Sequence, residues 1–99
     1  MSSSRLEIAQ GRGFTMRAQV VESSGGHIAV RGTVCRSAFK PPPRYVRLER
    51  LGADGLALDA RTTSIRAMPG YRGGCGFFSF ADALSAGESA RLAALRWGG

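Results

Sequence analysis

Hydrophobic and polar residues alternate along much of this 99-residue chain, with the period of two that half-buried β-strands produce. In the clearest stretch, residues 26–35 (GHIAVRGTVC), one face carries Ile28, Val30, Gly32 and Val34, and polar or small residues occupy the other. The same alternation occurs in residues 14–21, 45–51, 56–63 and 76–81. Glycine, serine, proline and aspartate are frequent in the intervening segments, as expected for turns. The pattern therefore predicts an all-β domain.

The turn at residues 52–55 (GADG) joins two of these predicted strands, and its length sets their register. Two lengths would place Leu58 on the inner face. One is a three-residue loop that ends in Gly55 as a bulge, and the other is a five-residue loop that sets Arg47 opposite Asp59. The first has the better stereochemistry and the second has the better electrostatics, so both remain open.

The two ends of the chain are less regular. Ser85 to Glu88 fits the capping box of a helix, but residues 86–97 also alternate, and we expect a closing strand there. Residues 1–13 offer little to bury and are interpreted as a flexible lead-in, in which Leu6 and Ile8 allow a short edge strand. Residues 14–99 are expected to form a single domain.

Together these segments predict an antiparallel sandwich of two sheets, with about seven strands and immunoglobulin-like topology. A 99-residue sandwich needs its large apolar side chains for one thin core, which leaves little interior for a ligand cavity. Contacts with partners are therefore expected on loops and edges. The predicted core consists of Ile28, Val30, Val34, Val46, Leu48, Leu58, Phe78, Phe80 and Leu92.

The formal charge of +7 and a pI near 11.0 indicate an anionic partner, such as nucleic acid, lipopolysaccharide or a phospholipid surface. Lys40 is the only lysine among the 14 basic residues, and the arginines are scattered singly, a composition that GC-rich codon usage would also produce. No apolar run is long enough to span a bilayer. The first twelve residues lack the apolar segment of a signal peptide, so either the protein is cytoplasmic or an export leader has been removed.

The two cysteines, Cys35 and Cys75, admit three interpretations: a disulfide, two inert buried thiols, or a soft-metal pair completed by His27, Met16 or Met68. The disulfide is favoured because a small domain that is rich in loops benefits from a covalent link. If the protein is exported, we expect the two cysteines to be paired.

Two segments carry residue types that contribute most to protein interfaces. Residues 36–44 form a stiff basic arm around three consecutive prolines, which loses little entropy on binding. Residues 69–76 are rich in glycine and are bordered by aromatic and arginine side chains. The predicted binding residues are Arg36, Lys40, Arg44, Tyr71, Arg72 and Phe77.

No catalytic or cofactor motif stands out. The only histidine, His27, begins a predicted strand beside two glycines, where a solvent-facing position is expected rather than a place in a catalytic triad. The chain has no Walker loop and no GxGxxG ahead of a helix. The carboxylates of Asp54, Asp59, Asp82 and Glu88 fall in turns or on outward positions. We therefore expect no enzymatic activity, no cofactor and no metal.

Several short motifs resemble those of one family. Residues 30–34 (VRGTV) are similar to the opening strand of bacterial immunoglobulin-like and transthyretin-like modules, which include carboxypeptidase regulatory-like domains. Pro43 followed by residues 46–48 resembles their next strand, and residues 62–63 followed by 76–87 resemble a later T…G-x-F-x-F segment. The resemblance covers Ile28 to Leu95. It implies a non-catalytic accessory or interaction module, often secreted or periplasmic.

Three function classes follow. We expect a non-catalytic interaction module of the bacterial cell envelope, periplasmic or secreted, that binds a protein or an anionic envelope component. The alternatives are a small basic nucleic-acid-binding β-barrel and a periplasmic soft-metal-binding protein. The barrel would need aromatic side chains on one sheet face to stack bases, whereas Phe78 and Phe80 are assigned to the core.

Overall fold

The computed structural model describes residues 5–9, 14–22, 25, 27–36, 43–67, 75–85 and 87–95. All regular secondary structure in these ranges is β-strand. The strands are β1 (Leu6–Ala9), β2 (Phe14–Glu22), β3 (Ile28–Arg36), β4 (Tyr45–Leu51), β5 (Ala57–Ser64), β6 (Arg66–Ala67), β7 (Cys75–Leu84) and β8 (Ser89–Leu95).

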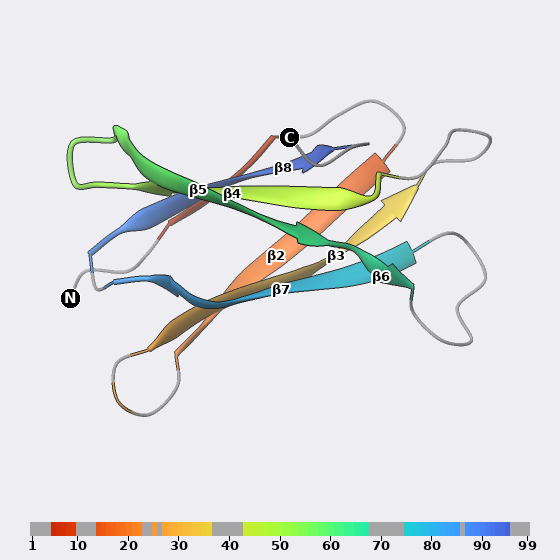
Figure 1. Cartoon of the computed structure of the whole chain (residues 1–99), viewed down its shortest axis with the longest axis horizontal. Coiled ribbons are helices and arrows are strands. Elements are labelled where there is room, and N and C mark those ends of the chain that lie inside the picture. The colour runs from red at the N-terminus through yellow and green to blue at the C-terminus, as the bar shows by residue number, and fades with distance from the viewer. Residues whose placement is uncertain are drawn as a thin grey trace.

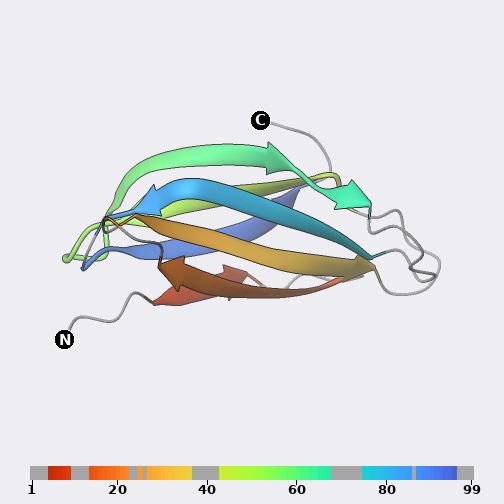
Figure 2. The ribbon, with the colours of Figure 1, turned by 90° about the horizontal axis from the view of Figure 1, so that it is seen from below.

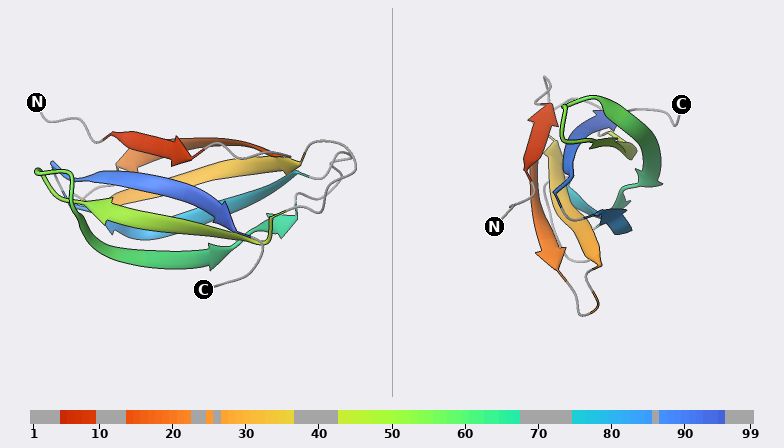
Figure 3. Two further views of the ribbon diagram at one scale, coloured as in Figure 1. Left: turned by 90° about the horizontal axis from the view of Figure 1, so that it is seen from above. Right: turned by 90° about the vertical axis from the view of Figure 1, so that its left-hand side faces the viewer.

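The strands form two four-stranded sheets, with the orders β1-β8-β4-β5 and β2-β3-β7-β6. The sheets face each other as two layers, with β4, β5 and β8 above β3, β7 and β6 in Figure 1; Figures 2 and 3 show the same ribbon from below, from above and from one end. The prediction of an all-β fold with two sheets is confirmed. Antiparallel pairing holds for every described pair except β1 with β8, which run parallel. At that edge the expectation of a fully antiparallel fold is wrong.

The segment from β5 to β6 passes from one sheet to the other with a single residue, Ile65, between the two strands. Figure 1 shows this segment running from the edge of the upper sheet to the edge of the lower one. The backbone N–H of Ile65 donates to the carbonyl oxygen of Arg44, 2.8 Å away, and so fixes the crossing to the start of β4. The side chain of Ile65 packs against the core.

The core lies between the sheets and contains eight of the nine predicted residues. The rings of Phe78 and Phe80 meet edge to face with their centroids 6.1 Å apart, a favourable geometry for an aromatic pair. Leu58 is the exception, because its side chain is 52% exposed. The buried apolar side chains are Met16, Ile28, Val30, Val34, Val46, Leu48, Leu51, Phe78, Phe80, Ala83, Leu84, Ala90 and Leu92.

A bulge in the β4–β5 hairpin explains why Leu58 lies outside. The hairpin has the three-residue loop: Gly52 N–H donates to the Leu56 carbonyl at 3.0 Å, and Gly55 has a φ of 82°. The register then shifts, because Leu51 pairs with Ala57 but the preceding β4 residue pairs with Asp59. Leu58 is therefore the extra residue of a bulge, which reverses the parity of the rest of β5.

Beyond the bulge, charged side chains take inward positions on β5. Asp59 lies opposite Arg50, and Arg61 lies opposite the buried Leu48. The Arg50 guanidinium is 2.9 Å from an Asp59 carboxylate oxygen and 3.7 Å from one of Glu88. These three side chains form an ion-pair cluster that links β4, β5 and the turn before β8. The five-residue loop, with Arg47 against Asp59, does not occur.

The closing segment is a strand, as the alternation predicted. The residues that fit a helix capping box form the turn between β7 and β8 instead. Ser85 N–H donates to the Glu88 carboxylate at 2.7 Å, and Glu88 N–H donates to the Ser85 carbonyl at 3.1 Å. Gly87, with a φ of 82°, completes the turn. Only the bond to the Glu88 carboxylate is one that a capping box would make, because Glu88 N–H bonds to the backbone carbonyl of Ser85 and not to its hydroxyl. The apolar alternation therefore predicts this segment better than the capping-box residues do.

Candidate interaction face on the outer side of one sheet

The outer side of the β2-β3-β7-β6 sheet carries a row of side chains from all four strands. Arg17 on β2 lies opposite Thr33 on β3, Thr33 opposite Phe77 on β7, and Phe77 opposite Arg66 on β6. Neighbouring strands are about 4.8 Å apart, so the row is about 14 Å long between the two arginine backbones. Arg31 lies in the adjacent row. We call these five residues the basic face.

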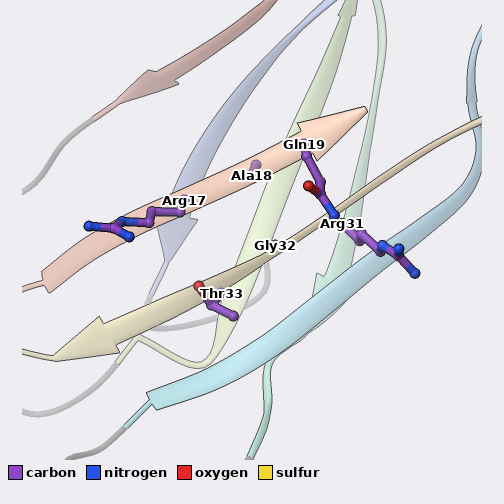
Figure 4. A pocket seen from close by; sticks show the side chains of 6 residues that line it. All are labelled: Arg17, Ala18, Gln19, Arg31, Gly32 and Thr33. Atoms are coloured by element: carbon purple, nitrogen blue, oxygen red, sulfur yellow. The ribbon is translucent and has the colours of Figure 1, made fainter. Parts of the chain in front are cut away.

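Alternation is the reason that these side chains point outward. The residues next to them in sequence, among them Met16, Val34 and Phe78, are buried between the sheets. Side chains of opposite parity must then face solvent. Figure 4 shows the β2 and β3 members of the face, Arg17, Arg31 and Thr33, together with Gln19. Phe77 is the aromatic member, with a side chain that is 39% exposed.

The surface of the basic face is uneven but holds no deep cavity among the described residues. One hollow of about 230 Å³ lies over Arg17, Arg31 and Thr33, and one of about 320 Å³ extends from there toward Cys35. Another, of about 270 Å³, is lined by Arg66 and Phe77. Hollows of this size along an open sheet suit contact with a partner surface better than enclosure of a small molecule.

Carboxylates are absent from the basic face. All seven acidic residues of the chain are in the described ranges, and five of them belong to the other sheet, its β4–β5 hairpin or the turn that leads into β8. The remaining two, Glu22 and Asp82, lie toward the opposite end of the sheet, beyond Arg31 and its cross-strand partner Ser79. None of the ion pairs between described residues includes Arg17, Arg31 or Arg66. The positive charge here is therefore not neutralised by those carboxylates.

A disulfide joins Cys35 and Cys75 on the same outer side, one row from Thr33 and Phe77. The two residues are direct cross-strand neighbours, with their Cα atoms 4.0 Å apart. The disulfide interpretation is therefore confirmed, and the inert-thiol and metal-pair interpretations are wrong. The bond also holds the end of β3 beside the start of β7.

The predicted binding residues are only partly covered by the structure. Phe77 belongs to the basic face, whereas Arg44 is exposed and lies just before β4 of the other sheet. Arg36 ends β3, and its side chain lies outside the described residues, as do Lys40, Tyr71 and Arg72. Sequence reasoning missed Arg17, Arg31 and Arg66. The alternation of β2 and β3 could have placed Arg17 and Arg31 on the outer side. The sequence does not show the register of the four strands, which brings Arg66 into the same row.

Polar side chains at the opposite end of the sheet form one close pair. His27 Nδ1 is 2.7 Å from an Asp82 carboxylate oxygen, and both side chains are largely exposed. Asp82 has a φ of 47° and lies where the β3–β7 register shifts. Aspartate and asparagine tolerate this left-handed conformation better than most residue types. The pairing was not predicted from the sequence.

The proposed soft-metal ligands that the structure describes do not come together. Met16 is buried in the core, the two cysteines are bonded to each other, and His27 lies beyond the opposite end of β3 from Cys35. Met68 lies outside the described residues. Within the described ranges, no cluster of three or more His, Cys, Asp or Glu side chains could hold a metal ion.

In the part of the chain that the structure describes, no helix is long and apolar enough to cross a membrane. Comparisons of the chain with protein-family models, with curated proteins and with solved structures found no match.

Proposed function

We propose that the chain is a non-catalytic interaction module that binds an acidic surface of a protein partner through its basic face. The observation that carries this proposal is the row formed by Arg17, Thr33, Phe77 and Arg66, with Arg31 beside it and no carboxylate among them. Arginine and exposed aromatic side chains are the types most enriched at the energetically important parts of protein interfaces.

The charge of the basic face supports binding in two ways. Because the guanidiniums of Arg17, Arg31 and Arg66 have no described carboxylate partner, binding an acidic surface would not first require an internal ion pair to break. Their combined potential would also speed the encounter with an acidic partner, and this effect weakens as salt is added. Phe77 supplies an apolar contact between the charges.

Strand order supports an immunoglobulin-like class for the module. Such domains have one sheet with the order A-B-E-D and another built from C, F and G, to which some members add C′. If β2 is taken as A, then β2-β3-β7-β6 follows A-B-E-D, and β5-β4-β8 follows C′-C-F. Strand β1 then occupies the edge where G is expected, although it comes first in the chain and runs parallel to its neighbour.

The disulfide supports a location in the periplasm or outside the cell. Disulfides persist in oxidising compartments and are rare in the cytosol. The Cys35–Cys75 bond joins strands of the same sheet, unlike the bond between sheets in antibody domains. Its position next to the basic face would keep β3 and β7 in register under the face.

A capture experiment with envelope extract tests the proposal. The immobilised variant Arg17→Gln/Arg31→Gln should lose a protein that the wild type retains, and raising the salt concentration should release that protein from the wild type. The matched control is Arg5→Gln/Arg47→Gln, which removes the same charge from two exposed arginines, one just before β1 and one on β4 of the other sheet, and should retain the partner. Circular dichroism must show that both variants keep the fold.

Two outcomes would contradict the proposed function. Equal capture by the wild type and the basic-face variant would remove this face from consideration. Loss of nuclease-sensitive material, rather than of a protein, would favour the nucleic-acid-binding alternative, for which Phe77 and the arginines provide a stacking and charged surface.

A further inference from the structure

Strand β1 forms the edge of its sheet, and its only described ladder is with one strand, β8. It pairs in parallel with β8 over four residues, from Leu6 opposite Ala90 to Ala9 opposite Ala93. Its neighbour β8 pairs on the other side with β4 over seven residues. Parallel pairing is slightly less stable per residue than antiparallel pairing, so β1 has both the shorter and the weaker ladder.

The position that β1 occupies is nevertheless part of the core. The side chains of Leu6 and Ile8 pack against the buried cluster that contains Leu92. The N–H of Ala90 donates to the carbonyl of Arg5 at 3.0 Å, which closes the edge of β8. Without β1, the N–H and C=O groups along this edge of β8 would lose their partners, and part of the apolar core would be exposed to water.

The occupant of this edge is selected by its side-chain pattern. Between the two apolar side chains, Glu7 faces outward, and its carboxylate accepts a hydrogen bond from Arg91 Nε at 3.2 Å. The β8 edge thus binds an extended segment with an apolar, an acidic and an apolar residue in succession. Leu6, Glu7 and Ile8 provide that pattern, and every copy of the chain carries it.

The other edge of the same sheet is protected against pairing with a second chain. β5 carries the bulge at Leu58, and the charged side chains of Asp59 and Arg61 take inward positions. Bulges and inward-pointing charges are features that prevent edge strands from pairing with other chains. At the other edge of this sheet, the described pairing of β1 with β8 contains no bulge.

From these observations we propose that β1 is exchanged between two copies of this chain. In the resulting dimer, β1 of each copy pairs with β8 of the other, and the described contacts of β1 with β8 and with the core are formed between the two copies. Because the contacts are the same, the balance between monomer and dimer depends on the effective concentration of β1 beside its own β8, about millimolar for a short tether. The dimer is therefore expected at high protein concentration. This inference does not depend on the basic face.

Cross-linking between two single-cysteine variants tests the exchange. Glu7→Cys and Arg91→Cys are prepared separately, each with the native disulfide already formed, and one is isotope-labelled. The two side chains are in contact, and both are exposed, so a short bis-maleimide can join the introduced thiols. After mixing at high concentration, mass spectrometry should detect the link between unlike chains about ten-fold above the control, because exchange brings the two positions together.

The control for chance encounters is Glu7→Cys mixed with Gln19→Cys, whose thiol lies on the outer side of the opposite sheet. The double variant Glu7→Cys/Arg91→Cys, treated while dilute, should form the link within one chain. It should then stay monomeric in sedimentation at concentrations where the wild type dimerises. If links between unlike chains do not exceed the control, or if the double variant forms no internal link, the proposal is wrong.

Discussion

Replacing Gly32 with alanine should destabilise the fold strongly, because the position has no room for a Cβ atom. Gly32 lies in the middle of β3, between β2 and the ring of Phe78. An added Cβ would overlap the carbonyl oxygen of Arg17, and would lie 2.8 Å from the Ala18 Cα and 2.9 Å from Phe78 Cζ. Two of these three neighbours are backbone atoms, which cannot move away by a change of rotamer.

The magnitude follows from these contacts. Carbon atoms pack best at about 3.5–4.0 Å, so β2 and β3 would have to separate by about 1 Å near Gly32. Weakening two ladder hydrogen bonds costs about 2 kcal/mol. Displacing the Phe78 ring adds an overpacking cost of about 1–3 kcal/mol. The lower chain entropy of unfolded alanine offsets about 0.4–1 kcal/mol. We expect a net loss of about 3 kcal/mol, a large part of the stability of about 5–15 kcal/mol that is typical of a domain.

Urea unfolding of the oxidised protein, followed by circular dichroism, measures this loss. Gly55→Ala is the matched control: a Cβ there would meet nothing within 4 Å, but the residue has a φ of 82°. That conformation costs alanine about 1–2 kcal/mol. With a slope of about 1.5 kcal/mol per molar urea, Gly32→Ala should lower the midpoint by about 2 M. If Gly32→Ala lowers the free energy of unfolding by no more than Gly55→Ala does, the conclusion that β2 and β3 approach too closely for a Cβ atom is wrong.

Three further measurements probe the disulfide, the bulge and the inward charges. The Cys35→Ser/Cys75→Ser double variant opens a link across a sequence separation of 40. In the chain-entropy estimate it should lose about 4 kcal/mol of unfolding free energy, and a loss below about 1 kcal/mol would contradict that estimate. Leu58→Ser should change stability by less than about 0.5 kcal/mol, whereas Leu48→Ala should cost about 2–5 kcal/mol. If denaturant unfolding shows the same loss of stability for Leu58→Ser and Leu48→Ala, the conclusion that Leu58 lies outside the core is wrong. Arg50→Met should cost about 1–2 kcal/mol, since Asp59 loses its ion-pair partner and Glu88 keeps only the hydrogen bond from Ser85 N–H, and a thermal melt unchanged from wild type would refute this.

Most of the fold could be predicted because alternation is a local property. Residues such as Val30, Val46 and Phe80 lie on the inner side of their strands, where the period of two put them. Leu58 could not be assigned correctly from the same pattern, since one bulge residue reverses the parity of all that follows. Nothing in the composition of residues 56–63 marks the bulge. The pairing of β1 with β8 also lay beyond the pattern, because it joins opposite ends of the sequence.

The basic face could be predicted only in part. That Arg17 and Arg31 point outward follows from the alternation of β2 and β3. That Arg66 lies opposite Phe77 depends on a two-residue strand that reaches the second sheet after a crossing. Such a placement is set by packing of the whole domain. For the cysteines, the sequence left three interpretations because a separation along the chain does not determine a separation in space.

The scattered arginines carry a lesson about charge in all-β proteins. On a helix, a charged patch is built from residues three and four apart, so clustering in sequence indicates clustering in space. On a sheet face, neighbours along one strand are two residues apart and neighbours across strands are linked only by register. Arg17 and Arg66 lie in one row although 49 positions separate them in the sequence. Single arginines at outward positions of paired strands are therefore what a basic sheet face looks like in sequence, and their lack of clustering does not count against a binding surface.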